Sequence, residues 1–89
     1  MPVTDNKALN RFELAEDDHL AFATYRRHEH SVSIPHVEAD PALRGKGTSG
    51  RLMQGIVEMA RREGFSITPT CPFAKGWFAK HPEASDVLG

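Results

Sequence analysis

A single long amphipathic segment, residues 48–62, stands between stretches whose side chains alternate as they do in strands. Its apolar side recurs at helical spacing and consists of Leu52, Met53, Ile56, Val57 and Ala60. Thr48 and Ser49 offer hydroxyls for an N-cap, and Gly64 is a natural C-terminal stop. Gly55 is unfavourable inside a helix, so its presence indicates close packing there. A helix in this place is a crossover that can set the strands before and after it side by side and parallel.

The segments around this helix predict four strands and one short helix. The strands are expected at residues 8–14, 20–25, 32–39 and 65–68. Pro35 interrupts or bulges the third strand, because proline cannot donate to a strand ladder. Residues 16–18 are expected to form an acidic turn and residues 26–30 a charged turn. A short helix over residues 73–80 ends before Pro82, and the order of the elements predicts an α+β fold.

Length and composition narrow the class of protein. The 89 residues fit one domain, residues 1–89, in which the polar residues 1–7 are expected to be flexible. A net charge of -1 gives no general attraction for nucleic acid or an anionic membrane, so any anion site must be local. There is no long apolar run, and residues 1–10 lack the apolar region of a secretory signal. One cysteine, Cys71, excludes an internal disulfide and is typical of a reducing compartment, so we expect a cytoplasmic protein with no nucleic-acid or membrane partner.

Directly before the helix, the segment Arg44-Gly45-Lys46-Gly47-Thr48-Ser49-Gly50, here called the glycine loop, packs three glycines and two cations into seven residues. Glycines let backbone N–H groups approach a ligand without hindrance from a Cβ. The N-terminus of a helix adds unpaired donors and the positive end of a dipole. Arg44 and Lys46 add charge where an anion would lie. The glycine loop therefore predicts a pyrophosphate site.

Three other interpretations fit parts of the glycine loop. A flexible basic turn that starts a helix and binds nothing stays open, because glycine-rich turns are common. A Walker A loop is excluded, because its spacing of Gly, four residues and Gly-Lys-Ser/Thr is absent. The dinucleotide fingerprint GxGxxG is formally present at residues 45–50, but it belongs to the first turn of a larger βαβ domain, whereas this loop follows three expected strands.

Several motifs in order resemble the GNAT acetyltransferases. The glycine loop is similar to their motif A, Gln/Arg-x-x-Gly-x-Gly/Ala, with Ser49 at the last small position. Within that superfamily the chain resembles the short YjdJ-like branch, from about residue 11 to residue 88. The matching segments are His36-Val37-Glu38-Ala39, Pro69-Thr70-Cys71-Pro72-Phe73, Trp77, His81-Pro82-Glu83 and Asp86-Val87.

The resemblance implies a minimal GNAT fold, a mixed and mostly antiparallel sheet with one long crossover helix and a short C-terminal helix. The sheet would splay between the strand before the glycine loop and the strand after the helix, and acetyl-CoA would lie in that splay. Its pyrophosphate would meet the loop amides, and its pantetheine would bond to the strand backbone as an added strand would. The coenzyme A contacts implied are Glu38, Ala39, Arg44, Gly45, Lys46, Gly47, Thr48, Ser49, Gly50, Cys71, Phe73 and Lys75.

Acetyl transfer from a thioester to an amine needs a deprotonated nucleophile, an oxyanion donor and an acid for the leaving thiolate. Cys71 is the first catalytic candidate, either as a carrier of the acetyl group or as a wall of the pocket while the amine attacks directly. It is equally read as a small buried hydrophobe. His36 and Glu38 lie two apart, hence on one strand face, where a histidine beside a carboxylate can act as general base. They are equally read as a surface pair.

Two further patterns have more than one interpretation. Trp77 and Phe73, four residues apart, are expected to anchor the last helix in the core. The segment 28–30, His-Glu-His, invites a metal site together with His36, but no fourth ligand is evident, so no metal is expected.

The function expected is an acyl-CoA-dependent N-acetyltransferase that moves the acetyl group of acetyl-CoA to an amine. The alternatives are a non-catalytic module that binds or senses acyl-CoA, and a small interaction domain with a relic loop. The identity of the acceptor stays open. A chain of this size leaves little to build a dedicated acceptor pocket, so a peptide or protein amine would fit an open cleft, and a homodimer would complete it.

Overall fold

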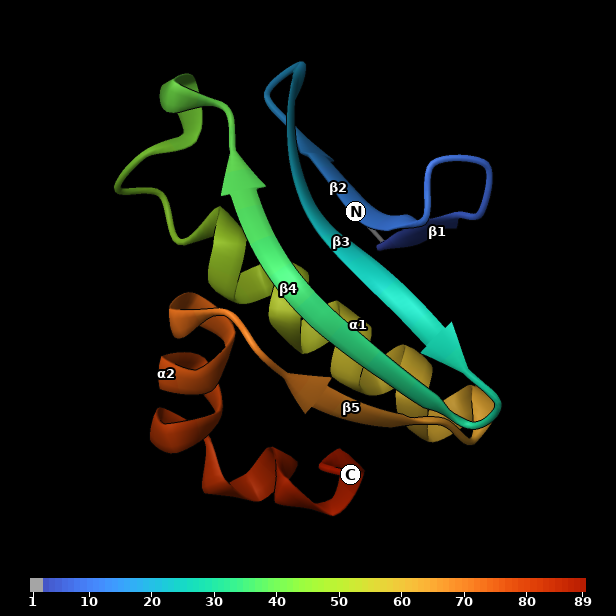
Figure 1. Ribbon diagram of the computed structural model, residues 1–89. Helices are drawn as coiled ribbons and strands as arrows, with labels where there is room; N and C mark the ends of the chain where they lie inside the picture. The colour runs from blue at the N-terminus through green and yellow to red at the C-terminus, as the bar shows by residue number, and fades with distance from the viewer. Residues whose placement is uncertain (1–2) are drawn as a thin grey trace.

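The computed structural model describes residues 3–89, which form a five-stranded sheet with two α-helices and two 3-10 helices (Figure 1). In chain order the elements are β1 (Thr4–Asn6), β2 (Arg11–Glu16), β3 (His19–His28), β4 (Ser31–Ala39), η1 (Pro41–Leu43), α1 (Thr48–Glu63), β5 (Ser66–Pro69), α2 (Pro72–Lys80) and η2 (Pro82–Val87). The strands lie in the order β1-β2-β3-β4-β5. The expected α+β fold is confirmed.

The first four strands pair antiparallel, and β5 pairs parallel to β4. Helix α1 joins β4 to β5 and packs on one face of the sheet, where Figure 1 shows it crossing behind the strands. The core lies between α1 and that face, and Phe12, Ile34 and Ile56 are fully buried in it. The predicted mixed sheet with one long crossover helix is therefore confirmed.

The apolar side predicted for α1 is the side that is buried, with Leu52, Met53, Ile56, Val57 and Ala60 all in the core. Gly64 ends the helix with φ 80°, and its N–H donates to the carbonyl of Ala60 at 2.8 Å. The predicted hydroxyl N-cap was wrong, because the N-cap is Gly47, and no side chain among residues 3–89 caps the helix there. The Thr48 hydroxyl is buried and donates to Glu16 instead, since a buried hydroxyl needs a partner.

Pro35 lies at a β-bulge of β4, as the sequence predicts. The register between β3 and β4 shifts between Thr24 and Arg26, so that Ile34 and Pro35 together face Tyr25. The extra residue reverses the alternation of side chains along β4, so the residues that follow it face the opposite side of the sheet from the one that their spacing from Ile34 would give.

The bulge changes which residues of β4 face α1. Before it, Ile34 is fully buried in the core, and beyond it Val37 and Ala39 pack against the core instead. His36 and Glu38 are exposed and therefore point from the opposite face of the sheet.

The N-terminal segment differs from its prediction. Residues 1–7 are predicted to be flexible, whereas Thr4–Asn6 form β1 at the edge of the sheet, and residues 1 and 2 lie outside the described residues. The side chain of Val3 covers Gly55, where a Cβ would collide with it. This contact is the close packing that the mid-helix glycine indicates. The Tyr25 hydroxyl also ties β1 to the sheet by donating to Asp5 at 2.6 Å.

Strand β3 runs to His28 through the segment predicted as a charged turn. The strand continues through its ladder with β4, in which Arg27 lies opposite Val32, and the Arg27 guanidinium lies 5.7 Å from the ring centroid of Tyr25 and 5.0 Å from that of Phe65. The turn is therefore shorter than predicted and is confined to residues 29–30.

Helix α2 is anchored by Trp77, which is 7% exposed and lies against Gly50 of α1, with its Nε1 3.7 Å from where a Cβ of Gly50 would be. The prediction that Phe73 shares this role was wrong, because Phe73 is 43% exposed. No helix within residues 3–89 is long and apolar enough to cross a membrane.

Candidate functional site

The backbone of the glycine loop leaves a group of N–H donors free at the start of α1. Gly45 and Gly47 have φ values of 74° and 75°, in the left-handed region that favours glycine. Among the hydrogen bonds of residues 3–89, none is donated by the backbone N–H of Gly45 or of residues 47–50. The positive end of the α1 dipole lies at the same place, so the loop offers the donors and the partial positive charge that an anion would need.

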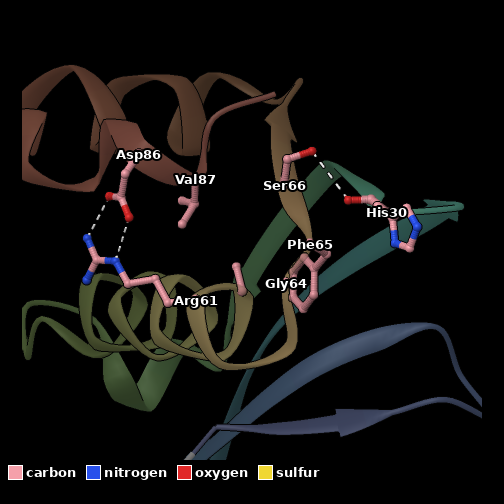
Figure 2. Close-up of a pocket in the computed structure, with 8 residues that line it drawn as sticks. His30, Arg61, Gly64, Phe65, Ser66, Asp86 and Val87 are labelled. Carbon is pink, nitrogen blue, oxygen red and sulfur yellow. Dashed lines mark hydrogen bonds and ion pairs between the residues drawn. The ribbon is translucent and has the colours of Figure 1, made fainter.

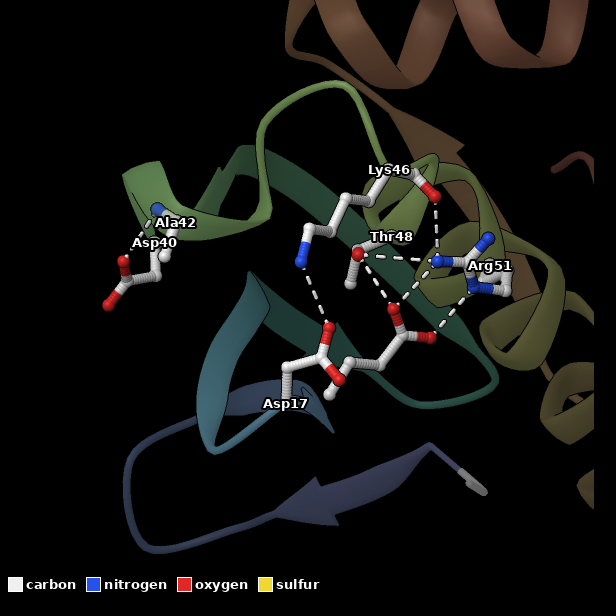
Figure 3. A network of polar contacts seen from close by, with 7 residues as sticks. Asp17, Asp40, Ala42, Lys46, Thr48 and Arg51 are labelled. Carbon is white, nitrogen blue, oxygen red and sulfur yellow. Dashed lines mark hydrogen bonds and ion pairs between the residues drawn. The ribbon is translucent and has the colours of Figure 1, made fainter.

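Glu16, the last residue of β2, binds the side chains that flank these donors. Its carboxylate accepts from Thr48 Oγ1 and from Arg51 Nε and Nη2, each at 2.7 Å. Figure 3 shows Arg51 also reaching the carbonyl oxygen of Lys46, to which Nη2 donates at 2.8 Å. Hydrogen bonds from Arg51, and then from Thr48, lower the pKa of Glu16 to about 2, so this carboxylate is ionised at neutral pH.

The two cations predicted to face an anion have different surroundings. Lys46 Nζ lies 3.1 Å from Asp17 Oδ2 (Figure 3), in a pair whose side chains are 50% and 68% exposed. Such a surface pair is weak, so the ammonium of Lys46 can change partners. Arg44 follows η1, is exposed, and forms no ion pair within the part of the chain that the structure describes.

Strands β4 and β5 pair over only part of β4. Their ladder ends where Ile34 lies opposite Pro69. The Ile34 carbonyl then accepts from the N–H groups of Thr70 and Cys71, at 3.1 Å and 3.2 Å, and from the Thr70 hydroxyl at 2.9 Å. Within residues 3–89, no strand pairs with residues 35–39 on this side. The two strands diverge here, which is the splay that the resemblance implies.

The free edge of β4 in this splay is formed by particular main-chain groups. The N–H of Asp40 donates to the carbonyl of Leu20 in β3 at 3.0 Å. Main-chain groups along an antiparallel strand point alternately to its two sides, so those of Glu38 also point to β3. The N–H and C=O groups of Val37 and Ala39 therefore point to the free edge.

This register corrects one predicted contact. Glu38 is predicted to offer its backbone to the pantetheine, but its main chain points to β3, and the main chain of Val37 points to the free edge instead. Val37 is not among the predicted contacts, because the Pro35 bulge moves the alternation by one residue. Ala39 lies on the free edge, where the prediction places it.

Cys71 is the N-cap of α2 at the closed end of the splay. It is 8% exposed, and its Sγ accepts from the N–H of Ala74 at 3.4 Å. Within the described residues the sulfur makes no hydrogen bond to His36 or Glu38, so the structure does not join the three catalytic candidates into one contact network.

His36 and Glu38 lie together, as their spacing predicts. His36 Nε2 is 3.0 Å from Glu38 Oε1, and the two side chains are 55% and 59% exposed. The ring of Phe22 lies 6.4 Å from that of His36, and the Arg11 guanidinium lies 4.5 Å from the Phe22 centroid. This exposed pair can take a proton from a molecule that arrives over the face of the sheet opposite α1.

The remaining candidates are dispersed. Phe73 and Lys75 are exposed on the first turns of α2, just after Cys71. His28 ends β3, and within residues 3–89 no three His, Cys, Asp or Glu side chains are grouped so that they could hold a metal ion.

A separate open groove of about 440 Å³ lies at the other end of α1 (Figure 2). Its lining includes Gly64, Phe65 and Val87, beside the ion pair in which Arg61 Nε and Nη2 donate to Asp86 at 2.9 Å and 2.8 Å. None of the predicted site residues lines this groove. The candidate chemistry is therefore concentrated at the N-terminal end of α1 and along the splay.

Sequence reasoning did not find Glu16 and Arg51 as parts of this site. Glu16 belongs to the predicted acidic turn, and Arg51 to the polar side of the predicted helix. They are 35 positions apart, and spacing along the chain carries no signal for such a pair.

Comparisons with known proteins agree on one family. Residues 11–87 match the family model described as GCN5-related N-acetyl-transferase. The chain is also similar to the NMR structure of a GCN5-like protein from Staphylococcus aureus that is proposed to be an N-acetyltransferase, with a TM-score of 0.75, 29% identity, and coverage of 98% of this chain and 86% of that one. A comparison with curated proteins found no match.

Proposed function

Because this chain belongs to the GCN5-related N-acetyltransferase family, whose members generally take their acetyl group from acetyl-CoA, we propose that it transfers that group to an amine. The observation that carries the proposal is the set of free N–H donors in the glycine loop, at Gly45 and residues 47–50. A pyrophosphate needs several convergent donors, and this loop offers them at the positive end of a helix dipole. Arg44 and Lys46 would add positive charge to it.

The splay between β4 and β5 suits the pantetheine arm. Within residues 3–89 the main-chain donors and acceptors of Val37 and Ala39 at this edge have no strand partner, and the amides of pantetheine can bond to them as an added strand would. Cys71 lies where the splay closes, so the thioester would lie toward the Cys71 end of the splay. Phe73 and Lys75, exposed on the adjacent helix, border the same region.

His36 and Glu38 are proposed to deprotonate the amine. Because Nε2 of His36 faces Glu38, its Nδ1 is the ring nitrogen left to accept a proton, and the carboxylate stabilises the imidazolium that forms. More than half of each side chain is exposed, so no narrow pocket encloses the pair. This openness favours a bulky acceptor, such as an amine on a peptide or protein.

A titration of the ¹⁵N-labelled protein with coenzyme A and with acetyl-CoA tests the proposal. We expect amide shifts at Val37, Ala39, residues 45–50 and residues 71–77, and none at the groove around Gly64, which serves as the internal control. Unmoved loop amides at saturating coenzyme A would contradict the whole proposal. Binding without any acetylated amine, across a panel of peptides, would support the non-catalytic alternative instead.

Two substitutions separate binding from catalysis. We expect His36→Ala to lower kcat at least about tenfold while the Kd for coenzyme A changes less than about twofold, because His36 does not line the free edge of β4. Equal losses of binding and kcat in His36→Ala would mean a structural role.

If Cys71 carries the acetyl group, Cys71→Ala abolishes the labelled acetyl-enzyme seen by mass spectrometry. Full acetyl transfer by Cys71→Ala would rule out the covalent route.

A further inference from the structure

We propose that the side chains of Glu16, Thr48 and Arg51 form a brace that holds the glycine loop ready for a pyrophosphate, and that Arg51 also neutralises Glu16 beside the anion site. The inference rests on the proposed function, because it concerns the same loop. These side chains bond to one another and to the Lys46 carbonyl, and they would act on the ligand through the loop, so they are positioning residues.

The brace joins three elements that are separate in sequence. Glu16 at the end of β2 holds Thr48 and Arg51 in the first turn of α1, through three hydrogen bonds of 2.7 Å. Arg51 holds the Lys46 carbonyl at 2.8 Å. Gly47 therefore has both neighbours fixed, one through its carbonyl and the other through its hydroxyl, as Figure 3 shows for Lys46, Thr48 and Arg51.

A fixed loop matters because its glycines alone would not keep one shape. Gly45 and Gly47 occupy the left-handed region but can leave it at little cost. A loop that must order itself on binding loses affinity in proportion to the rarity of its competent shape. The brace removes that loss by fixing the loop before the ligand arrives.

The charges of the brace balance beside the site. An unpaired carboxylate next to the helix N-terminus would compete with an incoming phosphate for the same positive end. Arg51 forms a two-pronged pair with Glu16, and only 20% of the Glu16 side chain is exposed. Removal of Arg51 therefore leaves a poorly solvated negative charge at the site, whereas Glu16→Gln loses part of the brace but leaves no negative charge to oppose the anion.

The order of effects distinguishes a brace from an ordinary surface pair. With coenzyme A as the titrant in calorimetry, we expect Arg51→Ala to raise Kd about twentyfold and Glu16→Gln about fivefold. The double variant Glu16→Gln/Arg51→Ala should bind more tightly than Arg51→Ala, because the uncompensated charge is gone. Arg61→Ala is the matched control. Arg61 lies in the last turn of α1 and forms a similar bidentate pair with Asp86 of η2, so its loss should leave the Kd for coenzyme A within about twofold of the wild-type value.

A second measurement reports on the loop without ligand. ¹⁵N relaxation should show higher mobility of residues 45–50 in Glu16→Gln than in the wild type, with the last turn of α1 unchanged. If Arg51→Ala does not fold, Arg51→Lys replaces it, since lysine keeps the charge but loses the fork, and an intermediate loss is expected. Wild-type affinity in Glu16→Gln and in the arginine variant would overturn the brace while leaving the proposed function intact, and failure of the wild type to bind would remove both. A double variant no tighter than Arg51→Ala would overturn the neutralising role.

Discussion

Aspartate in place of Gly47 should raise the Kd for coenzyme A about thirtyfold, whereas asparagine at the same position should raise it only about threefold. Gly47 has φ 75°, a conformation that Asn and Asp tolerate better than other residues with a Cβ. The two side chains have nearly the same shape, so both variants make nearly the same steric change. Only aspartate adds a negative charge among the free N–H donors, so the difference between the variants measures the anion site.

Calorimetric titration of both variants provides the measurement. A Cβ at position 47 would lie 3.3 Å from Nη1 of Arg51, so both side chains meet the same neighbour and share any steric cost. The gap between the two Kd values should narrow as salt is raised, because salt screens charge and not shape. Equal Kd values for the two variants would show that the pyrophosphate does not approach Gly47.

Replacement of Phe12 by alanine should lower the free energy of unfolding by about 3–5 kcal/mol, because it opens a cavity at the centre of the core. Phe12 is fully buried, and its ring lies 4.5 Å from that of Tyr25 and 6.2 Å from that of Phe65. A domain of this length has a thin core, with a total stability of roughly 5 kcal/mol, so the variant should be largely unfolded at physiological temperature. Urea denaturation followed by circular dichroism measures the loss.

Leu9 provides the control for this substitution, because it is 57% exposed in the turn before β2. Leu9→Ala should change the free energy of unfolding by less than about 0.5 kcal/mol. A loss below about 1.5 kcal/mol in Phe12→Ala would mean that the rings of Tyr25 and Phe65 close the cavity.

The parts of the fold that sequence could predict are those with a local or periodic cause. The buried side of α1 follows from its spacing, the crossover follows from the position of the helix between two strands, and the bulge follows from Pro35. The glycine loop was predictable for the same reason, since closely spaced glycines such as Gly45 and Gly47 indicate a backbone with positive φ.

The parts that could not be predicted depend on contacts between distant segments. Strand β1 is polar and short. It forms because it pairs with the edge of β2 and because Val3 packs against Gly55 of α1. Glu16 looks like a turn residue until the fold sets it beside Thr48 and Arg51. Local sequence patterns indicate which residues have reactive or charged side chains, but the tertiary fold determines which of those side chains are in contact.

The bulge at Pro35 has a consequence for how β4 can vary. The bulge shifts the alternation of side chains by one residue. Up to Ile34 the even-numbered side chains of β4 face α1, whereas from His36 onward the even-numbered side chains face the opposite side of the sheet. Each half can change its residues to suit its own surroundings without disturbing the other. Deletion of one residue at the bulge would reverse the part of β4 beyond it. The side chains of His36 and Glu38 would then face α1, and those of Val37 and Ala39 would face solvent.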